Sequence, residues 1–171
     1  MKSKYDNAEW TRLRELSDLH EDKASCGVIA LASATGLTYK KAFDIFASVG
    51  RKKKQGVSDA EISMAIRESG YFPCHYHTRP LMKDYKHADT MTFNNAVKVL
   101  SKKKTYMLVS HDHVATLRNG EVIDWTSGRK YKVTWVIELQ TKDCNDEKDR
   151  MAREQFFIRK ERQLKTTRRN A

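Results

Sequence analysis

The chain has 171 residues, of which 39% are hydrophobic, and it contains only two prolines and seven glycines. This length and composition predict one folded domain with a short appendage, and they exclude a linker or a low-complexity protein. The net charge of +11 is of the kind found in proteins that bind nucleic acid, an acidic protein or an anionic membrane surface. Because the basic residues are spread along the chain, solvated loops and helix ends explain the same charge, and both interpretations stay open.

The N-terminal region lacks the apolar core of a signal peptide, and no stretch approaches the roughly 20 apolar residues of a membrane span. We therefore expect no membrane-spanning segment. The three cysteines, Cys26, Cys74 and Cys144, are widely spaced and include no CxxC pair. This spacing argues against a disulfide framework or a cysteine-based zinc site, and a reducing, cytoplasmic setting fits it best.

Helical patterns dominate the first part of the chain. An amphipathic helix is expected over residues 5–19, and a second helix is expected from Cys26 to Gly36. The segment CGVIALASATG is apolar or small on every side, which is typical of a buried helix. Ser25 or Asp22 is a suitable N-cap for it. Cys26 is therefore expected in the first turn of a central buried helix.

The middle of the chain continues this helical pattern with one strand in it. Ser58 and Glu61 form an S-x-x-E capping box, which marks the start of a helix. The expected elements are a helix over residues 38–50, a helix over 58–70, a strand over 71–79 and a helix over 92–100.

The pattern then changes to β-rich runs, which read TYMLVS, HVATLR, EVIDW and YKVTWVIEL. The dipeptide Asn119-Gly120 lies between the second and the third run and is a strong signal for a tight hairpin. Helices followed by an antiparallel sheet argue for an α+β fold. The domain is expected to cover residues 1–140, and residues 141–171 to form a charged, peripheral helical tail.

The hairpin places two polar side chains near each other. With a two-residue loop, Ala115 pairs with Asp124, and His113 shares a face with Ala115. His113 and Asp124 are then diagonal neighbours, roughly 7–8 Å apart at the backbone, which an imidazole and a carboxylate can span. His111 lies on the same face but one step further away, so His113 is the better candidate partner of Asp124.

A carboxylate beside a histidine orients the ring and stabilises its charged form, and such a histidine can draw a proton from a thiol. The partial positive charge at a helix N-terminus also favours a thiolate there. Cys26, His113 and Asp124 therefore supply the two devices that activate a cysteine nucleophile, provided that the helix start packs against the hairpin.

In these motifs the chain resembles the papain-like cysteine peptidases, in particular the family that cleaves double-glycine leader peptides in bacteriocin exporters. The resemblance covers roughly residues 20–137 and rests on four segments in order, SCGVIALASATGL, GVSDAEISMAIRESGY, TYMLVSHDHVATL and NGEVIDWTSG. It implies a papain-like fold and a cofactor-independent hydrolase of peptide, isopeptide or related amide bonds. It further implies that Cys26 is the nucleophile, His113 the base and Asp124 the orienting acid.

Two positions differ from the family pattern. Relatives usually carry a glutamine a few residues before the cysteine as an oxyanion donor, whereas this chain reads HEDKAS there. His20 is a substitute donor in this region, although Glu21 and Asp22 would repel an oxyanion, and the backbone N–H of Cys26 is a further donor. Trp125 follows the acid, where the leader peptidases usually have proline.

Each candidate also has an ordinary structural interpretation. Cys26 suits a small core residue, His113 a hydrogen-bonded strand histidine, and Asp124 a residue that serves the turn after the hairpin. The cluster C-H-Y-H, residues 74–77, has no second ligand pair, and no metal site is expected there.

The second functional hypothesis is a binding protein. A papain-like scaffold without turnover would use its basic loops to hold nucleic acid or an acidic protein, and the +11 charge and the missing glutamine favour it. Arg51, Lys52, Lys53 and Lys54 form the densest basic cluster and are the candidate polyanion-binding residues.

Overall fold

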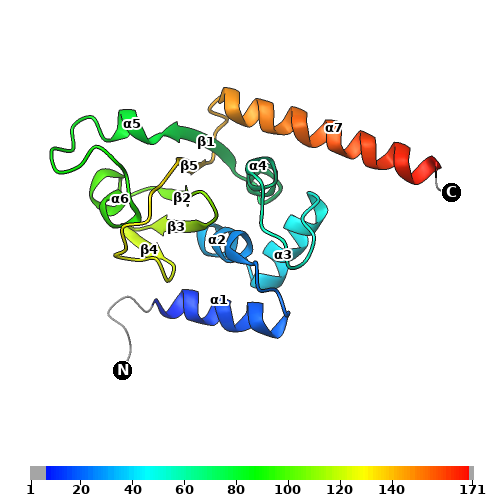
Figure 1. Ribbon diagram of the computed structural model, residues 1–171, viewed down its shortest axis with the longest axis horizontal. Coiled ribbons are helices and arrows are strands. Elements are labelled where there is room, and N and C mark those ends of the chain that lie inside the picture. The colour runs from blue at the N-terminus through cyan, green and yellow to red at the C-terminus, as the bar shows by residue number, and fades with distance from the viewer. Residues whose placement is uncertain (1–6, 170–171) are drawn as a thin grey trace.

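The computed structural model describes residues 7–169, which form seven helices and one five-stranded antiparallel sheet, as the α+β prediction requires (Figure 1). The helices are α1 (Ala8–Leu19), α2 (Cys26–Thr35), α3 (Tyr39–Ser48), α4 (Asp59–Glu68), α5 (Thr78–Leu81), α6 (Phe93–Val99) and α7 (Glu147–Arg169). The strands are β1 (Phe72–His77), β2 (Thr105–Val109), β3 (Val114–Arg118), β4 (Glu121–Ile123) and β5 (Trp135–Gln140). The short helix α5 was not expected from the sequence.

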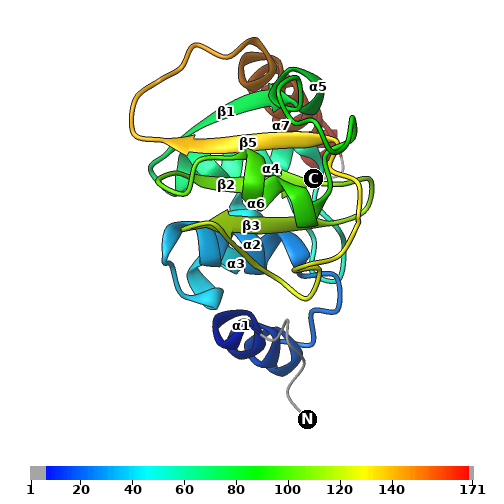
Figure 2. The ribbon, with the colours of Figure 1, turned by 90° about the vertical axis from the view of Figure 1, so that its left-hand side faces the viewer.

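The sheet has the strand order β1-β5-β2-β3-β4, and Figure 2 shows β1, β5, β2 and β3 one below another. Figure 1 shows α6 on one side of β2 and β3 and α2, α3 and α4 on the other. Alternate residues of β2 face opposite sides. Met107 and Val109 join the core formed with α2, α3 and α4, whereas Tyr106 and Leu108 join the core formed with α6. This period-two alternation, with both faces covered, explains why the β2 run is apolar throughout.

Several local signals act as the sequence predicts. The Ser58 hydroxyl accepts from the backbone of Glu61, and the Glu61 carboxylate accepts from the backbone of Ser58, so the capping box forms. Gly36 ends α2 in the left-handed conformation, with φ of 74°. The first helix begins at Ala8, and residues 5 and 6 of its predicted range lie outside the described residues.

The Asn119-Gly120 hairpin is confirmed. Both residues have positive φ, 55° and 76°, and the strands pair Arg118 with Glu121, as a two-residue loop requires. The ladder ends where Thr116 pairs with Ile123. The expected pair of Ala115 with Asp124 therefore lies one step beyond the sheet, where the chain is free of the strand geometry.

The charged tail forms α7, whose first half packs on the body through buried Ala152 and Phe156. Asp149, also buried, forms an ion pair with Arg67 of α4. Although α7 is long, within residues 7–169 no helix combines the length and the apolar character needed to cross a membrane.

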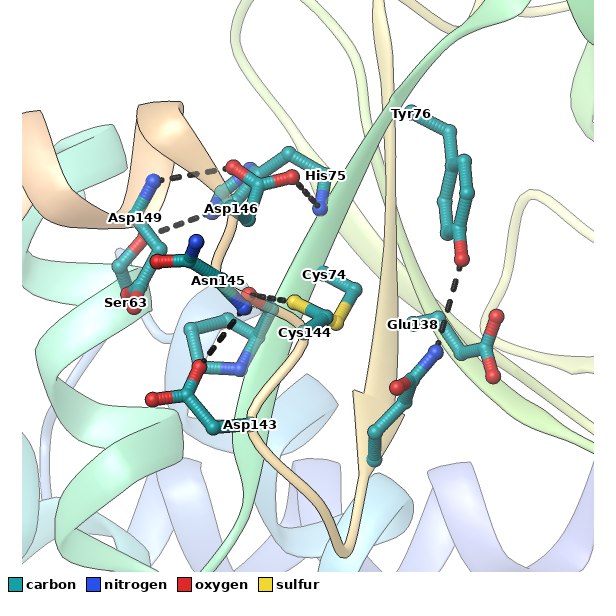
Figure 3. Close-up of a disulfide and its surroundings, with 12 residues drawn as sticks. Ser63, Cys74, His75, Tyr76, Glu138, Asp143, Cys144, Asn145, Asp146 and Asp149 are labelled. Atoms are coloured by element: carbon teal, nitrogen blue, oxygen red, sulfur yellow. Dashed lines mark hydrogen bonds between the residues drawn. A yellow bond between two sulfur atoms is a disulfide. The ribbon is translucent and has the colours of Figure 1, made fainter.

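Cys74 and Cys144 form a disulfide, which corrects the expectation drawn from the cysteine spacing (Figure 3). The two residues are 70 positions apart in sequence, but β1 pairs with β5, and Cys144 follows shortly after the end of β5. Antiparallel pairing thus brings the two cysteines together, with Cα atoms 6.1 Å apart. The pairing removes the support that the cysteines gave to a reducing setting.

Candidate active site

The start of α2 carries Cys26, the one free cysteine of the chain. Two contacts fix α2 along β3. The Thr116 hydroxyl donates to the carbonyl of Ala30 at 2.6 Å, and the Arg118 guanidinium donates to the carbonyl of Ser33. Because these contacts follow the same order in both elements, the start of α2 lies toward the start of β3, which His113 immediately precedes.

A buried polar network holds the segment before Cys26. Asp22 is fully buried and forms an ion pair with Arg51, 2.8 Å between Nη2 and Oδ2. The Ser17 hydroxyl donates to the carbonyl of Asp22 and lies 2.6 Å from the Ser25 hydroxyl. Ser25 occupies the N-cap position, but its hydroxyl is turned to Ser17 and makes no capping hydrogen bond. Asp22 does not cap α2, because its carboxylate pairs with Arg51. Because its charge is paired in this way, Asp22 does not exert the repulsion on an oxyanion at α2 that the sequence suggested.

The glycine after Cys26 is required by packing. A Cβ atom at Gly27 would lie 2.7 Å and 2.8 Å from the two γ-carbons of Val57. The missing side chain lets the segment before α4 approach the start of α2, so that Gly56 and Val57 form one wall beside Cys26.

The tight turn between β2 and β3 positions His113. Ser110 donates two hydrogen bonds to the carbonyl of His113, from its backbone N–H at 2.8 Å and from its hydroxyl at 3.1 Å. His111 and Asp112 lie at the exposed tip of this turn. The turn therefore separates the two histidines and holds His113 at the edge of the core.

His113 and Asp124 contact each other directly. The Nε2 atom of His113 lies 2.7 Å from Oδ2 of Asp124, so Asp124 pairs with His113 and not with His111. The same carboxylate oxygen accepts from the backbone N–H of Thr126 at 3.0 Å and from the Thr126 hydroxyl. Asp124 is buried and Thr126 is fully buried, which fixes the acid in a single orientation.

The surroundings of His113 favour a charged ring. Burial disfavours the charge, but the hydrogen bond to Asp124 and the interaction with the Cys26 side chain outweigh it and raise the pKa of His113 to about 10. A positively charged imidazole beside a cysteine stabilises a thiolate. The arrangement therefore suits an ion pair of Cys26 and His113.

Two cavities, of about 260 Å³ and 320 Å³, meet at Cys26, Gly56, Asp112 and His113. We call them together the cleft. Its aromatic end is walled by Trp10, Arg14, Lys23 and Trp125. Its aliphatic end is walled by Val57, Ile62, Val109 and Val114, and it is also lined by Asp59, Ser110 and His111. A chain molecule passing over the Cys26 sulfur would thus have a pocket on either side of the sulfur.

His20 is not among the residues that line the cleft. Its Nδ1 atom lies 2.8 Å from the carbonyl oxygen of Leu16, and its ring packs against Tyr39 with centroids 5.1 Å apart. Trp125 does reach the site, where its ring centroid lies 5.4 Å from that of His113. The tryptophan ring therefore packs beside the His113 ring.

The basic cluster divides into two parts. Arg51 is buried by its ion pair with Asp22, whereas Lys52, Lys53 and Lys54 are exposed. Arg51 is therefore a structural residue and cannot contact a polyanion.

The C-H-Y-H segment is likewise used internally. Cys74 is in the disulfide, His75 lies 3.0 Å from the Ser63 hydroxyl, and His77 packs on Trp135. Burial lowers the pKa of His75 to about 4. No group of three or more potential metal ligands occurs within the described residues.

Two residues of the site were missed from the sequence. Thr126 stands two positions after Asp124. The Asp-x-Thr spacing is visible in the sequence and indicates a local contact between the two side chains. Trp10 reaches the cleft from α1, and no sequence pattern connects it to Cys26.

No family model, no curated protein and no solved structure matches this chain. The case for the site therefore stands on the geometry of Cys26, His113 and Asp124 alone.

Proposed function

We propose that this chain is a papain-like cysteine hydrolase that cleaves a peptide, isopeptide or related amide bond. The observation that carries the proposal is the position of His113, which bonds Asp124 through Nε2 and shares the cleft with Cys26. Since Nε2 is occupied, Nδ1 is the ring nitrogen left to exchange a proton with the sulfur. The order of the elements is also that of the papain-like resemblance.

The chemistry follows from these positions. The Cys26 thiolate attacks the carbonyl carbon of the substrate, and the carbonyl oxygen takes the negative charge. His113 then gives its proton to the leaving amine, and the C–N bond breaks to leave a thioester on Cys26. In the second half, His113 takes a proton from water, the hydroxide attacks the thioester, and the thiolate leaves.

Backbone groups supply the oxyanion donors in this proposal. The first N–H groups of a helix have no intrahelical partner, and Ser25 does not cap α2 with its side chain. The N–H groups at Cys26 and Gly27 therefore replace the glutamine that relatives use, and they act together with the partial positive charge of the helix end.

The first experiment measures the alkylation rate of Cys26 by iodoacetamide near neutral pH. Because Cys74 and Cys144 are paired, the labelled thiol is Cys26 in the non-reduced protein. His113→Gln should slow labelling roughly tenfold to a hundredfold, since the thiolate loses its cation. His111→Gln makes the same change two residues away and should leave the rate within about twofold.

The second experiment measures turnover. The protein is incubated with a peptide library, and new termini are detected by mass spectrometry, with Cys26→Ala as the control. New termini that require Cys26 support the hydrolase. Fast, His113-dependent labelling without any cleavage would instead favour the scaffold without turnover, and equal labelling of the two histidine variants would remove His113 from the site.

A further inference from the structure

The charge of α7 is unevenly distributed. The segment from Glu147 to Phe156 contains three basic and three acidic residues, whereas the segment from Phe157 to Arg168 contains five basic residues and one acidic residue. The five are Arg159, Lys160, Arg162, Lys165 and Arg168. The positive charge of this helix therefore lies in its distal half.

The two halves also differ in their contacts. The charges of the first half are used to anchor the helix, as in the pairs of Asp149 with Arg67 and of Lys148 with Asp59. In the distal half every residue from Phe157 to Arg168 is exposed, and none of the five cations pairs with a carboxylate of residues 7–169. Figure 1 shows this half running past α4 to the far end of the molecule. Arg159 contacts the Ser58 hydroxyl at 3.5 Å and Lys160 lies over the Phe156 ring, but the charge of this half is not neutralised by an ion pair within the described residues.

A second set of free cations stands on the loop between α3 and α4. The carboxylate of Asp22 accepts from the Arg51 guanidinium and from the backbone N–H of Lys54, which holds the loop backbone in place. Lys52, Lys53 and Lys54 remain exposed. The loop therefore presents three charges from an ordered backbone.

A groove of about 210 Å³ lies between α7 and the end of α3. It is bordered by Val49 and Gly50, which directly precede the lysine loop, by Ala60 and Glu61 of α4, and by Phe156, Arg159, Lys160 and Gln163 of α7. The distal half of α7 therefore lies beside the residues that lead into the lysine loop, although the two segments are far apart in sequence.

We propose that the distal half of α7 and Lys52, Lys53 and Lys54 form one surface that binds the phosphate backbone of a nucleic acid. Arg159, Arg162, Lys165 and Arg168 recur every three residues, so each cation lies about 4.5 Å further along the helix axis than the last and about 60° around it. Cations at this close spacing suit a polymer with regularly spaced phosphates.

The neighbours of these cations favour nucleic acid over an acidic protein. Gln163, Thr166 and Thr167 are uncharged polar groups of the kind that contact phosphate and sugar. Phe157 is 59% exposed among them, and the aliphatic residues Ile158 and Leu164 are exposed as well. An exposed aromatic ring between basic residues offers a stacking platform for an unpaired base. A single-stranded nucleic acid is therefore the expected ligand.

The test is fluorescence anisotropy with a labelled single-stranded RNA of about 20 nucleotides, at several salt concentrations between about 50 and 200 mM. The loop variant replaces Lys52, Lys53 and Lys54 with Gln, and the helix variant replaces Arg159, Arg162 and Lys165 with Gln. The control variant replaces Lys86, Lys102 and Lys103, which are exposed and lie outside the surface. Each variant removes three positive charges, and Arg51 is left unchanged because it supports the fold.

We expect each surface variant to weaken binding at least about tenfold. The slope of log affinity against log salt should fall by roughly two to three, because a protein with fewer phosphate contacts releases fewer counterions when it binds. The control variant should weaken binding by no more than about threefold. An equal loss in all three variants would show that the charge acts diffusely and would overturn the proposal. Equally tight binding of polyglutamate, a chain of carboxylates, would overturn it in favour of an acidic protein partner.

The surface and the cleft are tested separately. Cys26→Ala should bind the RNA as the unchanged protein does, and both surface variants should keep the Cys26 alkylation rate. RNA binding that depended on Cys26 would contradict an independent surface.

Discussion

The Nε2 atom of His113 lies 2.7 Å from the carboxylate of Asp124. Asp124 directly follows Ile123, the last residue of β4 that pairs with β3. The contact fixes which ring nitrogen faces the acid and leaves Nδ1 free of the carboxylate. It also explains the high pKa of His113, because the paired carboxylate and the neighbouring sulfur outweigh the effect of burial.

The raised pKa of His113 makes a contribution to stability that depends on pH. The folded pKa, about 10, lies above the ordinary value of 6.5. The contribution is therefore fully present below about pH 6.5 and is lost as the pH rises through about 10. We expect Asp124→Asn to lower the melting temperature strongly at pH 6.5 and much less at pH 9. Thermal unfolding of both proteins at the two pH values measures this, with His111→Gln as the control. If the two melting temperatures differed by the same amount at both pH values, the contribution of Asp124 to stability would not depend on the charge of His113.

Thr126 is expected to act as a positioning residue for the acid. Thr126→Val removes the hydroxyl that donates to Asp124 and keeps the backbone bond. We expect slower Cys26 alkylation, by roughly threefold to tenfold, and a lower pKa at His113 by NMR titration. Thr35→Val also removes a partly buried hydroxyl that makes local hydrogen bonds, at the other end of α2, and should leave both readouts unchanged. The hypothesis fails if Thr126→Val affects stability alone.

Gly27 is predicted to be constrained by Val57. In a free helix, alanine is favoured over glycine by about 1 kcal/mol, but here the new Cβ would overlap both γ-carbons of Val57. We expect Gly27→Ala to destabilise the protein by about 1–3 kcal/mol in urea unfolding. Val57→Ala added to it should restore most of the loss, because the overlapping atoms are gone. A double variant no more stable than Gly27→Ala alone would mean that another constraint acts on Gly27.

The ion pair of Asp22 and Arg51 should be costly to break. Both side chains are nearly inaccessible to solvent, with 0% and 1% exposed, so removing one partner leaves a buried charge without compensation. We expect Arg51→Ala to cost about 3–5 kcal/mol of unfolding free energy. Lys52→Ala, one residue further along, should change it by less than about 0.5 kcal/mol. Similar effects of the two substitutions would argue that the pair is solvated.

The features that the sequence predicted correctly depend on neighbours in the chain. The capping box of Ser58 and Glu61 needs residues three apart, and the Asn119-Gly120 loop sets its own backbone conformation. The diagonal relation of His113 and Asp124 followed from counting back from that loop. Local geometry was therefore enough to bring these two side chains together.

The features that were missed depend on contacts between distant segments. Nothing near Asp22 in sequence indicates that Arg51 neutralises it, and nothing near Cys74 indicates that β5 delivers Cys144 to it. The same reason explains why the prediction for His20 was wrong. Its position six residues before Cys26 suggested an oxyanion donor, but its ring packs against Tyr39 and does not line the cleft. The packing of α2 on β3, on which the whole site depends, is also a contact between distant segments, and only the family resemblance predicted it.

The bond between Cys74 and Cys144 closes the chain into a covalent ring that contains β5, β2, β3 and β4. His113 and Asp124 lie inside the ring, and Cys26 lies outside it. A protease that cuts once in the exposed connection after α5, for instance beside Lys83, opens the ring without separating the two pieces. We expect such a nicked protein to run as one band on a non-reducing gel and as two after reduction. Two bands before reduction would mean that the cysteines are unpaired.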